Sequence, residues 1–141
     1  MSHEQKLTKP LANYSHLRRS GDLLFLAGQG CRDPETNVWA GVSFDAKGQL
    51  IGIDFEAQVR GVFKNIEAVL ISEGYSRKHV VDVHVFLTDM EKQFPTVNRV
   101  WDEYFGGVNP PPTRTTIGVR ELPGLNQVEM KVIASTKISI T

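Results

Sequence analysis

The stretch from Asp54 to Gly74 constrains the fold more than any other part of the chain. Its apolar residues recur three or four positions apart, at the spacing of one face of a helix; they are Val59, Val62, Phe63, Ile66, Val69 and Leu70. Asp54 is a good N-cap and Gly74 is a good helix stop, so both ends of the predicted helix are marked. Because a helix with one apolar stripe has to bury it, we expect a second structural layer beneath it.

The segments around this helix have the pattern of strands. In residues 81–87 valines and a leucine alternate with other residues, and 23–28 is a short apolar run between glycines, as in a buried strand. Residues 31–48 contain several turn signals and are predicted to form a loop. The full prediction has strands at 14–19, 23–28, 81–87, 113–122 and 127–138, and helices at 54–74 and 94–105.

This order of elements predicts an α+β fold in which two helices pack on one face of a mixed sheet. The prediction is a single domain over residues 1–141, with a loose N-terminal arm at 1–12. Two helices can cover only one face of such a sheet. We therefore expect other copies of the chain to cover the second face, which makes the protein a homo-oligomer.

Charge and composition exclude several classes of function. Sixteen basic and sixteen acidic side chains cancel, so neither nucleic acid nor a membrane surface is an expected partner. No apolar stretch approaches the ~20 residues of a membrane span, and the single Cys31 fits a reducing compartment, so we expect a cytoplasmic protein. The four histidines lack metal-ligand spacing and no phosphate-binding glycine motif occurs. Neither a metal nor a nucleotide cofactor is expected.

Arg114 and Glu129 are the strongest candidates for catalytic residues. Arg114 stands at the start of a predicted strand after three prolines, and Glu129 lies in the next strand. An arginine can hold a carboxylate with two parallel hydrogen bonds, and a glutamate can orient water or take its proton. The pair indicates hydrolysis of a small amino acid derivative. The alternatives are a structural arginine and a glutamate on the solvated face of a strand.

Several motifs, spaced in order along the chain, resemble the RidA/YjgF family of enamine/imine deaminases. They are Tyr14-Ser15, residues 21–29, Gln58 with Asn65-Ile66, Thr96-Val97-Asn98, Pro112-Thr113-Arg114-Thr115-Thr116, Leu122-Pro123 and Val128-Glu129. Within the family the chain looks most like the 2-aminomuconate deaminases, through the residues from Tyr14 to Asp22 and through 112–116. The resemblance covers nearly the whole chain, from about residue 14 to residue 134.

The resemblance implies a chorismate-mutase-like protomer, a homotrimer, and an active site between neighbouring subunits. It implies a reaction without cofactor or metal, in which water adds to an enamine or imine and ammonia leaves to give a 2-oxo acid. By position, Arg114 is the carboxylate-binding arginine and Glu129 the water-orienting acid. Tyr14 and Asn98 match the family's other polar positions in the cleft. Gly28 and Gln29 are further candidates for substrate binding, because a glycine lets backbone amides approach a substrate closely. Thr116 completes the predicted substrate-binding set. The leading substrate is 2-aminomuconate.

Two positions depart from the family pattern, because Ala27 replaces a frequent serine and Thr116 a frequent cysteine. These departures count against the small imines that the family usually takes and fit a branch with a different acid as substrate. The alternatives are a general deaminase of 2-iminopropanoate-type acids and a trimer that binds small acids without turnover. A dicarboxylate such as 2-aminomuconate needs a second cation, and the candidates are Arg18, Arg19, Arg32 and Arg120. We expect His16 at the surface, with a position in the cleft beside Tyr14 as the alternative, and Cys31 as an ordinary thiol near the site.

Overall fold

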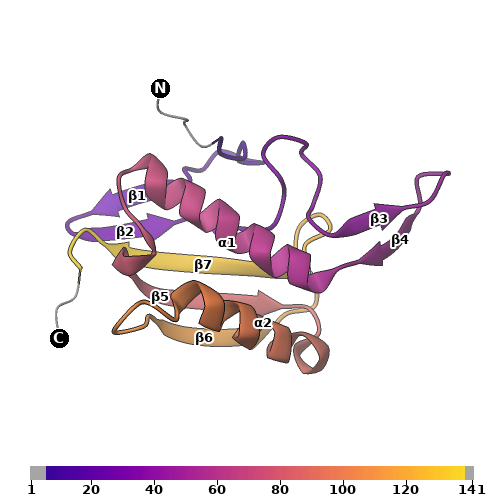
Figure 1. The fold of residues 1–141 in the computed structure, drawn as a ribbon. Helices are drawn as coiled ribbons and strands as arrows, with labels where there is room; N and C mark the ends of the chain where they lie inside the picture. Colours follow the sequence, from indigo (N-terminus) through magenta and orange to yellow (C-terminus); the bar gives the residue numbers. More distant parts are fainter. Residues whose placement is uncertain (1–5, 139–141) are drawn as a thin grey trace.

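The computed structural model describes residues 6–138 and contains one sheet with two helices on the same face (Figure 1). The main sheet has five strands and a separate hairpin has two. The elements are β1 (Leu17–Ser20), β2 (Leu23–Leu26), β3 (Val42–Phe44), β4 (Leu50–Ile53), α1 (Phe55–Ser72), a 3₁₀ turn (Arg77–His79), β5 (Val80–Leu87), α2 (Met90–Phe105), β6 (Thr113–Gly118) and β7 (Val128–Ser135). Two helices on a mixed sheet confirm the predicted fold class.

The main sheet has the strand order β1-β2-β7-β5-β6. Only the β5–β6 pair is parallel, because α2 carries the chain from the end of one strand back to the start of the other. The buried valines of β5 and the even-numbered residues of β7 point toward the helices, as the sequence pattern predicted. Strand β6 is an edge strand, so its side chains have a neighbouring strand on one side only.

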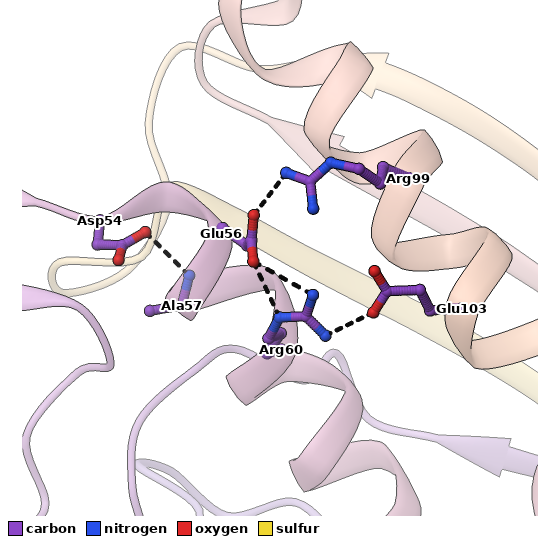
Figure 2. A network of polar contacts seen from close by, with 6 residues as sticks. All are labelled: Asp54, Glu56, Ala57, Arg60, Arg99 and Glu103. Atoms are coloured by element: carbon purple, nitrogen blue, oxygen red, sulfur yellow. Dashed lines mark hydrogen bonds and ion pairs between the residues drawn. The ribbon is translucent and has the colours of Figure 1, made fainter.

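Helix α1 begins and ends where the sequence indicated. The Asp54 side chain accepts a hydrogen bond from the backbone N–H of Ala57 (Figure 2). At the other end Gly74 has a φ of +83°, and the N–H groups of Gly74 and Tyr75 bond back to Ile71 and Leu70. This closing pattern needs the left-handed conformation that glycine adopts at little steric cost.

Helix α2 starts four residues before the predicted Phe94. The prediction placed Pro95 near the helix start, whereas the helix holds it inside. The true start is stabilised by Asp89, whose side chain accepts from Lys92 N and whose own N–H donates to the Gln93 side chain at 2.9 Å. Pro95 is the sixth residue of α2, beyond the first four N–H groups that lack an intrahelical partner, so it removes the hydrogen bond that residue 95 would otherwise donate to Glu91 O.

The two helices are joined on their outer sides by a chain of ion pairs (Figure 2). Glu56 on α1 contacts Arg99 on α2 at 2.5 Å and Arg60 at 3.2 Å, and Arg60 contacts Glu103 on α2 at 2.8 Å. These contacts lower the pKa of Glu56, with the hydrogen bond from Arg99 as the largest cause. The network fixes how α2, and the face it presents to β6, is placed against α1.

The prediction of a loop at 31–48 was partly wrong, because this segment contains strand β3. Strand β4 follows it. The two strands form a hairpin that projects beyond the main sheet (Figure 1). The turn between them is stabilised by the Asp45 side chain, which accepts from Lys47 N and Gln49 N, and by Gly48 at φ +80°. An Asp-x-x-Gly turn between two short apolar runs was the sequence signal for it.

Four predicted strands were too long or began too early. The first strand begins at Leu17 and not at residue 14, β2 ends at Leu26, β6 ends at Gly118, and β7 ends at Ser135. Beyond these ends the backbone bonds to other parts of the fold: Val119 N donates to Leu87 O and Thr136 N to Asp22 O. Of the predicted arm at 1–12, residues 6–12 contain no helix or strand, and 1–5 lie outside the described residues.

Candidate active site

Arg114 lies on the edge strand β6 and contacts α2. It pairs in register with the buried Val83 of β5, so it shares the helix-covered face of the sheet. Its Nη2 donates a hydrogen bond to Asn98 Oδ1 at 2.7 Å, which confirms that these two predicted site residues are neighbours. The guanidinium carbon lies 4.9 Å from the centre of the Trp101 ring and 5.6 Å from that of Phe94. Aromatic and amide contacts therefore hold it in place.

The guanidinium of Arg114 is charged but has no carboxylate partner among the ion pairs of residues 6–138. Burial lowers the pKa of Arg114, and the charge of Asp102 opposes the effect. Arginine has five N–H donors, and a hydrogen bond to a neutral amide leaves most of them for a ligand. A half-buried, unpaired arginine favours binding of an anion.

Thr116 follows two positions along β6 and lies on the same face as Arg114, in register with Val85. It is half-buried. Arg114, Asn98 and Thr116 thus form one group, which we call the arginine cluster. Three of the predicted site residues are brought together here.

Glu129 lies on the opposite face of the sheet. It alternates with the buried Val128 and Met130 on β7 and pairs in register with Phe86. It lines a cavity of about 270 Å³, together with the predicted residues Tyr14, Gly28 and Gln29. Several unpredicted residues share this lining, among them His16, Arg32, Trp39 and Asn126. We call this pocket the glutamate cavity.

Burial raises the pKa of the Glu129 carboxyl group. Burial disfavours the charged form, so this carboxylate takes up a proton more readily than an exposed one does, as a general base requires. Gly28 lies directly against it: a Cβ atom at residue 28 would stand 2.2 Å from Glu129 Oε1. The glycine therefore leaves the space that the carboxylate occupies.

Gln29 has a different role from the predicted one. We expected the backbone amides of Gly28 and Gln29 to approach the substrate. The N–H of Gln29 instead donates to Met130 O at 2.8 Å, and its side chain donates to Ala27 O at 3.0 Å. Gln29 is 3% exposed. It holds the end of β2 against β7 and so fixes the position of Gly28.

The N-terminal segment forms one wall of the glutamate cavity. Thr8 and Lys9 line the cavity, and their carbonyl groups accept hydrogen bonds from His16 Nε2 and Arg32 Nη2. The expectation of a surface position for His16 was wrong, because its side chain lines this cavity and its Nδ1 is buried. Its position beside Tyr14 was the only sequence signal for this.

Cys31 lies next to the glutamate cavity but does not have the properties of a nucleophile. It is 1% exposed, and burial raises the pKa of its thiol to about 11. Its backbone N–H and Sγ contact Asn126 Oδ1 at 2.8 Å and 3.2 Å. A protonated, buried thiol is unreactive, which confirms the interpretation of Cys31 as an ordinary thiol.

The arginine cluster and the glutamate cavity are separated by the sheet. Arg114 and Glu129 point to opposite faces, with β5 between their strands. A small molecule on one face of a sheet cannot contact a side chain on the other face. The sequence grouped the two residues as one catalytic pair, whereas within one protomer they lie on opposite faces of the sheet.

Residues 6–138 contain no group of three or more histidine, cysteine, aspartate or glutamate side chains arranged to hold a metal ion. Neither helix of the described chain is both long enough and apolar enough to cross a membrane. Another hollow, of about 370 Å³, lies near Pro110–Pro112 and is lined by Lys78, His79 and Lys137. It contains none of the predicted site residues.

Comparison with known proteins gave one family and a consistent fold. Residues 4–136 match the model of the family described as endoribonuclease L-PSP. A RutC family protein from Aquifex aeolicus is 34% identical over 92% of this chain and 93% of its own length. The structure of RidA from a Psychrobacter species is 29% identical, covers 92% of this chain and 94% of its own, and gives a TM-score of 0.77. The structure of Escherichia coli TdcF with bound serine is 25% identical over 92% and 93%, also with a TM-score of 0.77.

Proposed function

Because the chain belongs to the endoribonuclease L-PSP family, which includes the RidA and YjgF proteins, we propose that it is a hydrolase that deaminates enamine and imine carboxylates. The leading substrate is 2-aminomuconate, the reaction needs neither cofactor nor metal, and the enzyme works in the cytoplasm. One observation carries the proposal: a buried carboxyl group with a raised pKa lines a cavity of small-molecule size. The unpaired Arg114 supplies the matching carboxylate binder.

The active site is completed by a second copy of the chain. The arginine cluster of one protomer faces the glutamate cavity of its neighbour, so that one substrate contacts both. The outer face of the main sheet supports this assembly, since Leu23 and Ile117 are 42% and 40% exposed and neither helix of residues 6–138 covers that face (Figure 1). Closed rotational symmetry is the usual way to bury the same apolar surface on every copy, and the proposed assembly is a homotrimer.

In the proposed reaction an enamine first takes a proton from solvent on carbon and becomes an iminium ion. Arg114 holds the carboxylate next to the iminium carbon. Water attacks that carbon while the Glu129 carboxylate takes one of its protons, which gives a carbinolamine. Glu129 then returns the proton to nitrogen. The C–N bond breaks as Glu129 takes the hydroxyl proton and the carbonyl forms. Ammonia and a 2-oxo acid are released, and Glu129 gives its proton back to solvent.

The ligand in one related structure supports this class of substrate. The TdcF structure is described as containing bound serine, which has an α-carboxylate and an α-nitrogen. An imino acid has the same two groups in the same relation. The half-buried Arg114 would bind the carboxylate, and the buried carboxyl group of Glu129, whose pKa is raised, would transfer the proton to the nitrogen.

The family description names an RNA-cleaving activity, which the composition of this chain does not favour. Its formal net charge is zero, and nonspecific RNA binding depends on clustered basic side chains. The remaining alternatives are a general deaminase of 2-imino acids and a trimer that binds small acids without turnover. The substrate assay separates them.

The assay compares three substrates with the purified protein. Freshly made 2-aminomuconate and 2-iminopropanoate are each followed by ammonia release or by competition with semicarbazide, and an RNA is followed by gel. We expect fast release from 2-aminomuconate. Ammonia release from 2-iminopropanoate alone would indicate a general deaminase. RNA cleavage alone would overturn the proposal. Ligand binding without ammonia release would indicate a binding protein.

Replacing Gly28 by alanine is expected to lower kcat on the order of 10²-fold with little loss of stability. The new Cβ displaces the Glu129 carboxylate, which is the movable end of a side chain, so the fold itself can remain. The control is Gly52→Ala, where a Cβ meets nothing within 4 Å. Steady-state kinetics and thermal denaturation check both variants, and an unchanged kcat in Gly28→Ala would show that the position of Glu129 is not critical.

A further inference from the structure

Arg32 is an unpaired cation in the same cavity as Glu129. We propose that Arg32 binds a second carboxylate of the substrate and makes the site selective for dicarboxylic imines. This inference rests on the proposed deaminase function and names the substrate class of that site. Arg32 lines the glutamate cavity, while the other arginines that could take this role do not.

The position of Arg32 is fixed through its backbone. The side-chain amide of Asn65 on α1 donates to Arg32 O and to Gly30 O, each at 2.9 Å. Arg32 also forms an antiparallel bridge with Trp39, another residue of the cavity lining. Asn65 is 8% exposed, so this anchor is shielded from solvent. A guanidinium mounted on such a backbone is pre-organised for a ligand.

The charge of Arg32 is not neutralised within the described part of the chain. The hydrogen bond that its side chain makes goes to a neutral acceptor, the Lys9 carbonyl, at 2.5 Å. The ion pairs of residues 6–138 do not include it. Arg32 and Glu129 line the same cavity of about 270 Å³, and they do not form an ion pair with each other.

The other three arginines lie elsewhere. Arg19 donates to Gly21 O at 2.8 Å and lies 4.0 Å from Asp22. Arg18 is exposed on β1 beside Phe25, and Arg120 is exposed after β6. None of them lines the glutamate cavity.

This placement gives the substrate a defined orientation. The carboxylate next to the imine carbon binds Arg114 of one copy, the imine carbon lies near Glu129 of the next copy, and the distal carboxylate reaches Arg32. There the carboxylate replaces the Lys9 carbonyl as the acceptor. A charged acceptor makes a stronger hydrogen bond with a guanidinium than a neutral one does.

The test compares a dicarboxylic and a monocarboxylic substrate. In Arg32→Met we expect kcat/KM to fall on the order of 10- to 100-fold for 2-iminoglutarate. For 2-iminopropanoate, which has no distal carboxylate, we expect no more than about a 2-fold change. Arg32→Lys should recover part of the loss, and the exposed control Arg120→Met should change neither value. An equal loss on both substrates, or no loss on 2-iminoglutarate, would overturn the inference.

A binding measurement separates this inference from the proposed function. The product analogues 2-oxoglutarate and pyruvate are titrated calorimetrically into wild type and Arg32→Met, whose folding is checked by thermal denaturation. Weaker binding of 2-oxoglutarate alone supports the role of Arg32 even if wild type shows no turnover, in which case only the deaminase proposal fails. Equal 2-oxoglutarate binding by both proteins contradicts the role of Arg32 even if wild type is an active deaminase.

Discussion

Replacing Arg114 by alanine is expected to lower kcat/KM for an imine carboxylate by on the order of 10²- to 10³-fold. Arg114 is the half-buried cation that would hold the substrate carboxylate, and its contacts with Asn98 and Trp101 fix its orientation. Its loss should weaken both ligand binding and turnover. Kinetics on the wild type and variant, with calorimetric titration of a 2-oxo acid, measures the two effects separately.

A lysine at position 114 gives the graded control. Lysine keeps the charge but cannot form two parallel hydrogen bonds, so we expect Arg114→Lys to lie between wild type and Arg114→Ala. Because Arg114 packs on Trp101 and Phe94, the thermal stability of each variant must be compared as well. A fully folded Arg114→Ala protein with nearly normal kcat/KM would show that the arginine is structural.

Replacing Glu129 by glutamine is expected to lower kcat by about 10²- to 10⁴-fold, the range for loss of a general acid–base group. Glutamine has nearly the same shape and fits beside Gly28, so ligand binding should change little. This pattern differs from that of Arg114→Ala, which loses both binding and turnover. If Glu129→Gln retained normal kcat, the water-orienting role would be wrong and the glutamate would belong to the scaffold.

The pH dependence of kcat/KM gives a second test of the role of Glu129. Glu129 must be ionised to take a proton from water, so kcat/KM should fall as the pH drops through its pKa. Burial raises that pKa above the usual value of 4.5, and the acid limb of the wild-type profile should be displaced upward accordingly. The residual activity of Glu129→Gln should lack this limb. Profiles of both proteins on one substrate provide the measurement.

The sequence predicted the layers of the fold because periodicity reports which side of an element is buried. The stripe on α1 and the alternation on β7 both agree with the structure. The same alternation placed Glu129 on the face opposite Val128 and Met130. For Arg114 no such inference was possible, because the face of an edge strand depends on its register with β5, and register is set by contacts distant in the sequence.

The walls of the glutamate cavity were the least predictable part. His16 directly precedes β1, Arg32 lies in the loop after β2, and Trp39 lies shortly before β3. Only tertiary contacts bring these residues to Glu129. The N-terminal segment lacks periodicity, and its position depends on hydrogen bonds from His16 and Arg32 to its carbonyl groups. Every residue has a backbone carbonyl group, so the sequence does not show which of them will accept a hydrogen bond.

The division of the site between two copies is the central claim, and mixing two inactive variants tests it most directly. Arg114→Ala retains Glu129, and Glu129→Gln retains Arg114. When the two proteins are dissociated together and reassembled in equal amounts, random pairing across a shared interface gives about a quarter of the sites both native residues. We expect the mixture to recover about that fraction of wild-type activity, while each variant treated alone stays inactive. A mixture that forms mixed oligomers and remains inactive would contradict the shared site.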